Sequence, residues 1–240
     1  MSSKKEKRRL LGSFIYPAFL IVILWLIKFI EIWFEVDFSY FGIIPLELRG
    51  LPGIITAPLI HSDLGHLTSN SIPIFLLTAG LFYYYDKSAF QIFFIAYLIT
   101  GIWVWLFARG DASHIGASGV VYALASYHFF SGLIRRQHQL MAFAMIVAFL
   151  YGSMVWGVVP DFYPKENISW ESHLMGAVAG LLLAFFYRDK GPQKEKREFK
   201  EHDEEWEERI RQMHGYYPDE LEIHYEIKEK NKNKEENKDS

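Results

Sequence analysis

Charged residues are almost absent from the first three quarters of this chain, and no other feature constrains its fold as strongly. Of the 178 residues from Leu10 to Tyr187, only 17 are Asp, Glu, Lys or Arg, whereas the other 62 of the 240 residues hold 36. A soluble domain carries charge at about a quarter of its positions, spread over its whole surface. A chain so poor in charge cannot cover a surface that faces water, so we expect its solvent to be lipid.

Six stretches predict helices that cross a bilayer, which requires about 20 mostly apolar residues each. The first runs from Leu10 to about Phe34 and is too long for the apolar part of a signal peptide, so we interpret it as a retained anchor. The others are Leu64–Tyr85, Ser88–Ala108, Ile115–Ile134, Gln139–Pro160 and Ser172–Tyr187, the last beginning near Ile168. Residues 35–60 contain several Gly and Pro residues and are interpreted as a loop at the membrane interface.

Basic residues in the connections predict the orientation, because cytoplasmic loops carry an excess of Lys and Arg. One side would hold the leader at 4–9, Lys87, Arg135, Arg136 and the basic run from Arg188, and the other only Arg49, Arg109 and Lys165. Both termini are therefore expected to be cytoplasmic, with the protein in the plasma (inner) membrane. The prediction is an all-α protein with a basic N-terminus (1–9), a six-span membrane domain (10–187) and a charged, partly disordered cytoplasmic tail (188–240).

Composition excludes several other classes of function. The chain has no cysteine, which rules out a disulfide framework, a thiolate metal site and a cysteine nucleophile. Its net charge of -3, with no basic stripe interleaved with aromatic residues, argues against nucleic-acid binding.

The second predicted span begins with polar residues, although polar groups are costly inside a membrane. His66 and Asn70 are four residues apart, so they share one face of a helix. A polar outer end on an apolar helix indicates that water reaches partway into the bundle. The structural alternative, hydrogen bonding between helices, is favoured for Thr68, Ser69 and Ser71, whereas a function is favoured for His66 and Asn70.

The fourth span opens with Gly116-Ala117-Ser118-Gly119. The two glycines leave the Ser118 hydroxyl sterically open and allow close backbone approach. Unpaired N–H groups at a helix N-terminus stabilise a nearby negative charge, which suits an oxyanion. Packing or capping would explain such a tetrapeptide equally well when it is taken alone.

The sixth span carries His173, Gly176 and Gly180 on one face, and small residues four apart let another helix approach closely. Ser118 and Tyr122 share a face of the fourth span. If these two faces meet, the serine and the imidazole come within hydrogen-bond range, and Tyr122 can pack on the imidazole.

The predicted topology brings these polar residues to one level. With the N-terminus inside, the second, fourth and sixth spans all begin on the outer side of the membrane. His66, Asn70, Ser118 and His173 each lie in the first or second turn of those spans, so all four fall at a similar depth in the outer leaflet.

These motifs, in this order on alternate spans, resemble the rhomboid family of intramembrane serine proteases. The resemblance covers roughly residues 10–187. It implies a six-helix bundle in which Ser118 is the nucleophile and His173 the general base of a dyad. It further implies an oxyanion hole formed by His66, Asn70 and the backbone N–H of Ser118, with Tyr122 supporting the histidine. One departure is the first loop, where some members carry a Trp-Arg pair and this chain has Leu48-Arg49-Gly50.

The implied activity is hydrolysis of peptide bonds in or near single transmembrane segments of substrate proteins within the lipid bilayer. A catalytically silent relative that escorts membrane helices is one alternative, and a transporter that uses His66, Asn70 and His173 as a polar pathway is another. A metal site at His61, His66 and His173 is a third, but the chain has no His-Glu-x-x-His motif and no carboxylate placed to activate a bound water. We expect neither a metal nor a cofactor.

Overall fold

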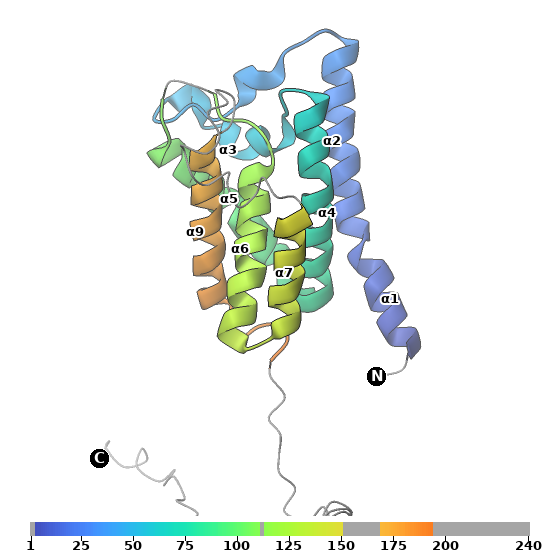
Figure 1. Cartoon of the computed structure of the whole chain (residues 1–240). Coiled ribbons are helices and arrows are strands. Elements are labelled where there is room, and N and C mark those ends of the chain that lie inside the picture. Colours follow the sequence, from blue (N-terminus) through green and yellow to red (C-terminus); the bar gives the residue numbers. More distant parts are fainter. Residues whose placement is uncertain (1–2, 111–112, 151–168, 194–240) are drawn as a thin grey trace, which may run out of the picture. The chain divides into compact units, whose positions relative to one another are not determined.

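The computed structural model describes residues 3–110, 113–150 and 169–193, and regular structure in these ranges is helical (Figure 1). The longer helices are α1 (Ser3–Ser13), α2 (Ile15–Trp33), α4 (Leu64–Tyr85), α5 (Ala89–Phe107), α6 (Ser118–Arg135), α7 (His138–Leu150) and α9 (Trp170–Phe186). Within the described ranges the β structure is limited to an isolated antiparallel bridge between Ile43 and His114. The all-α class predicted from the sequence agrees with this architecture.

Helix boundaries follow the predicted stretches closely. The helix α4 has the predicted bounds, and α5 and α9 begin and end within two residues of theirs. The first stretch starts earlier than expected, because the basic leader is already helical in α1. The second half of the fifth stretch and the tail from residue 194 onward lie outside the described residues. The structure predicted for them therefore stays a prediction.

Among the residues that the structure describes, two continuous helical stretches are long and apolar enough to cross a membrane, Lys4–Trp33 and Leu64–Phe107. The latter contains both α4 and α5, and the helices at His138–Phe149 and Trp170–Phe186 are apolar but shorter. Large apolar side chains such as Phe19, Trp33 and Phe186 are exposed on the outside of the helices. Exposed apolar surface of this kind suits contact with lipid, while the count of six spans stays a prediction.

The loop between α2 and α4 is a series of short helical turns rather than an irregular segment. It comprises η1 (Phe38–Phe41), η2 (Leu48–Gly50), α3 (Gly53–Thr56) and η3 (Ala57–Leu59). The Ile43 N–H donates to the His114 carbonyl, and the Gly116 N–H donates to the Ala57 carbonyl at 2.9 Å. These bonds attach the loop to the segment that leads into α6.

The helix α6 is the centre of the bundle, where it contacts α4, α5, α7 and α9 (Figure 1). Its closest partner is α9, because glycines on α9 let the two backbones approach each other. A methyl group at Gly176 would collide with the Gly119 carbonyl, and one at Gly180 would collide with the Ala123 carbonyl. The small residues of the sixth stretch therefore permit the close approach of α6 and α9.

Candidate active site

Ser118 and His173 lie side by side where α6 and α9 begin. The Ser118 Oγ is 2.8 Å from the His173 Nε2, which is hydrogen-bond distance. The backbone turns into α6 at Gly116, whose φ of +107° is a conformation that glycine adopts readily and other residues rarely do. The sequence reasoning that the glycine face of α9 would carry His173 towards Ser118 thus agrees with the geometry.

Tyr122 lies one turn after Ser118 and stacks on the imidazole. Its ring centroid is 4.2 Å from that of His173, and the two planes are 14° apart. Both side chains are buried, so the stacking restricts the rotation of the imidazole next to Ser118. This arrangement matches the supporting position that the sequence suggested for Tyr122.

His66 and Asn70 occupy the first two turns of α4, on the side that faces the start of α6. A methyl group at Gly116 would lie 2.7 and 2.8 Å from the Cε1 and Nε2 of His66, so this edge of the ring points at the glycine. The Asn70 Nδ2 donates to the His66 carbonyl at 3.0 Å. A side-chain amide has two N–H donors, so one remains for a second acceptor.

Asp63 is the N-cap residue of α4. Its carboxylate accepts a hydrogen bond from the His66 N–H at 2.8 Å. A cap of this type satisfies a backbone donor that has no partner within the helix.

His61 is buried next to His66, and the two rings meet edge-on with centroids 5.1 Å apart. The Ala117 N–H donates to the His61 Nε2 at 3.4 Å. His61 therefore supports the turn before Ser118, a contact that the motif spacing alone did not reveal.

Glu171 is a carboxylate two residues before His173 in the chain. Glu171 is in the first turn of α9, where it is buried and forms an ion pair with Arg109. Residues two apart on a helix point in different directions. Glu171 thus ties the segment after α5 to the start of α9.

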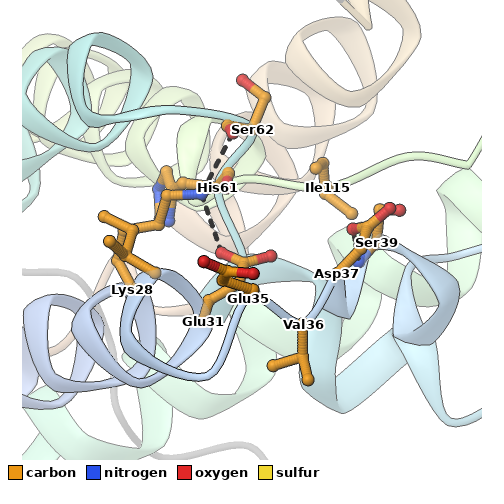
Figure 2. Close-up of a pocket in the computed structure, with 10 residues that line it drawn as sticks. Lys28, Glu31, Glu35, Val36, Asp37, Ser39, His61, Ser62 and Ile115 are labelled. Carbon is orange, nitrogen blue, oxygen red and sulfur yellow. Dashed lines mark hydrogen bonds and ion pairs between the residues drawn. The ribbon is translucent and has the colours of Figure 1, made fainter.

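Lys28 and Glu31 lie near the end of the first apolar stretch, where a long side chain can extend to the membrane interface. Both are instead buried, and their charged groups pair at 2.7 Å. Lys28 also donates to the carbonyls of His61 and Ser62 at 2.9 and 3.0 Å, and Figure 2 shows it between Glu31 and Ser62. A buried cation needs several acceptors to offset its lost hydration, and these carbonyls are in the turn before α4.

An open pocket of about 470 Å³ adjoins this ion pair. Figure 2 shows the carboxylates of Glu35 and Asp37 together with Ser39 along one wall, and His61 and Ser62 along the other. Within the described residues, no group of three or more His, Asp or Glu side chains is arranged to hold a metal ion.

Comparisons with known proteins agree with this geometry. Residues 49–190 match the family model described as the Rhomboid domain, which is more than half of the chain. The chain belongs to the Rhomboid family, whose members are generally intramembrane serine proteases.

Among its relatives, the uncharacterized protein Rv1337 of Mycobacterium tuberculosis is 35% identical over 154 residues, which are 60% of this chain and 62% of that protein. The putative rhomboid protease YdcA of Bacillus subtilis is 30% identical over 143 residues, which are 55% of this chain and 65% of that protein. The chain thus spans slightly less than two thirds of the length of the curated relatives it matches.

Proposed function

We propose that this protein is an intramembrane serine endopeptidase that acts through a dyad of Ser118 and His173. The observation that carries the proposal is the 2.8 Å separation between the Ser118 Oγ and the His173 Nε2. A serine hydroxyl is a weak nucleophile until a neighbouring base accepts its proton. The imidazole is within reach of that proton, and its stacking on Tyr122 preserves the required orientation.

In the first step, the His173 Nε2 takes the proton of Ser118 while the Oγ attacks the carbonyl carbon of the scissile bond. The resulting tetrahedral intermediate carries a negative oxygen. When it collapses, His173 returns the proton to the leaving amine and an acyl-enzyme remains. A water molecule then attacks the acyl group with the same histidine as base, which regenerates Ser118.

The negative oxygen needs donors that are already in position. The Ser118 N–H belongs to the first turn of α6, where backbone donors have no partner within the helix. The second N–H of the Asn70 amide and the imidazole of His66 complete the proposed oxyanion hole. Removing one such donor typically lowers the rate by about 100- to 1000-fold.

The proposed substrates are proteins with a single transmembrane helix. A helix hides its peptide bonds, so cleavage requires a segment that unwinds easily. We propose that the scissile bond follows a small residue with helix-destabilising neighbours, near the outer end of the substrate helix.

We further propose six spans in the plasma membrane with both termini cytoplasmic. The basic connections support this orientation. Because the chain has no cysteine, single cysteines in the loops can be labelled from one side at a time. Labelling of Lys87→Cys from the outside would contradict the orientation.

Ser118→Ala tests the function in reconstituted membranes with a single-span substrate. Loss of the nucleophile should lower the cleavage rate at least about a thousandfold and abolish labelling by a fluorophosphonate probe. Ser126→Ala is the matched control, because this hydroxyl also lies on α6 and bonds to α9, at the Ala177 carbonyl. Undiminished cleavage by Ser118→Ala would reject the assignment, and a wild-type protein that neither cleaves nor reacts with the probe would indicate the silent relative.

A further inference from the structure

The hydroxyl of Ser62 lies between a carboxylate and the histidine of the proposed oxyanion hole. The Ser62 Oγ is 2.7 Å from the Asp63 Oδ2 and 3.2 Å from the His66 Nδ1. A hydroxyl has one proton to donate, so the two contacts cannot both receive it.

The carboxylate decides where that proton goes. Hydrogen bonds from the His66 backbone N–H and from Ser62 hold the pKa of Asp63 below its ordinary value. An ionised carboxylate can only accept, so Ser62 donates to Asp63. The remaining contact then needs a proton from the ring, and the His66 Nδ1 must be the donor to Ser62.

This proton assignment has a consequence at the opposite edge of the ring. A neutral imidazole carries one N–H, so with the proton on Nδ1 the Nε2 is a bare acceptor. It is the Nε2 that faces Gly116 and the start of α6. His66 can therefore donate to an oxyanion there only when it carries a second proton, as an imidazolium.

The turn that holds Ser62 is fixed from another helix. Lys28 on α2 donates to the Ser62 and His61 carbonyls, and Glu31 neutralises its charge (Figure 2). Of the other titratable groups, the His61 ring contacts His66 edge-on, and the Lys28 ammonium, which is paired with Glu31, acts on His66 from α2. Asp63 is the carboxylate of this set that does not belong to that ion pair.

We propose that Asp63 and Ser62 form a positioning relay that fixes the His66 proton on Nδ1, and that the Asp63 carboxylate offsets part of the cost of burying the imidazolium that donates to the oxyanion. The functional half of this inference rests on the proposed protease activity. The proton assignment itself does not, so the two can be tested separately.

The proton assignment is tested on the full chain in lipid nanodiscs by nitrogen NMR with labelled histidine. His66→Asn identifies the His66 signals by their loss. At alkaline pH we expect the neutral His66 ring to carry its proton on Nδ1, and Ser62→Ala to shift the ring towards the Nε2 tautomer. A wild-type ring protonated on Nε2 would overturn the relay whether or not the protein cleaves any substrate.

The functional consequence is tested by the pH dependence of kcat for Asp63→Asn and Ser62→Ala. Asparagine caps a helix about as well as aspartate, so the first variant removes the charge and retains the cap. We expect the alkaline decline of kcat to begin about one pH unit lower in both variants than in the wild type. At a pH above the wild-type decline, kcat of each variant should then be roughly tenfold below the wild-type value, with KM little changed.

Thr68→Ala is the control for that measurement, because this hydroxyl is also near the start of α4 but bonds only to the Leu64 carbonyl of its own helix. Its profile should match the wild type. Loss of kcat by the same factor at every pH in Asp63→Asn and Ser62→Ala, or no loss at all, would overturn the relay. Absence of cleavage by the wild type would instead contradict the proposed function and leave the NMR result to decide the proton assignment.

Discussion

At the scale of single residues, the site depends on a backbone position that only glycine fills well. Gly116 combines a positive φ with a close approach of the His66 ring. A side chain at this position would meet both a strained backbone and the imidazole edge that faces α6. The glycine is therefore required for the distance between α4 and the first turn of α6.

Gly116→Ala should lower cleavage by about 100-fold, comparable with the loss of one oxyanion donor, because the added methyl would displace His66. Gly110→Ala is the matched control, since its methyl would meet only the Pro45 carbonyl at 3.9 Å. Cleavage rates of both variants in the same reconstituted membranes check this. Equal activity of Gly116→Ala and the wild type would contradict the proposed role of His66.

At the scale of elements, α6 and α9 carry Ser118 and His173, and their contact is built on glycine rather than on large apolar side chains. Gly176 and Gly180 face the Gly119 and Ala123 carbonyls. Rigid backbone cannot move aside as a flexible side chain can, so any added volume here must separate the helices. Since Ser118 and His173 lie at the N-terminal ends of the two helices in this contact, the packing that stabilises the protein also sets the separation of these two side chains.

Gly180→Ala should destabilise the protein by about 1–3 kcal/mol, as overpacking a close contact does. Gly12→Ala in α1 is the control, because its methyl would meet nothing within 4 Å and alanine is the better helix former by up to about 1 kcal/mol. Chemical denaturation in detergent micelles measures both. A stability of Gly180→Ala at or above that of Gly12→Ala would show that the helices do not pack as described.

At the scale of the whole molecule, buried ionisable groups couple stability to pH. His61 lies just before α4, and burial lowers its pKa to about 3 from an ordinary value of 6.5, with the neighbouring His66 as the next cause. The unfolded chain therefore binds a proton at this residue at a pH where the folded protein does not. The stability that neutral His61 contributes is fully present above about pH 6.5. It is lost as the pH falls towards the pKa of His61 in the folded protein.

We accordingly expect the free energy of unfolding to fall by up to about 1.4 kcal/mol for each pH unit below 6.5 because of His61. His61→Gln removes the titration and should flatten this part of the stability profile. Denaturation across the mildly acidic range checks it. A variant that retains the wild-type slope would show that His61 is not its source.

Much of the architecture could be predicted from residue patterns, because a membrane demands long uncharged helices. The helix α4 was predicted to the residue, and the glycine and serine spacing on two spans predicted that Ser118 and His173 approach each other if these faces meet. The Lys28–Glu31 pair was not predicted, since a charge near a helix end looks the same whether it turns towards water or towards buried carbonyls. The contact of His61 with the turn before Ser118 and the Glu171–Arg109 pair were missed for a similar reason, as the partners are distant in the sequence.

The sequence by itself determined the helical class, the residue types available for chemistry and their level along the helices, because hydrophobicity and helical period act locally. Only the tertiary structure decided which faces meet and which atoms come within hydrogen-bond distance. That step depends on close packing between segments 55 residues apart, as for Ser118 and His173. The orientation of Lys28 follows from the same packing, since it depends on carbonyl acceptors that the turn before α4 supplies.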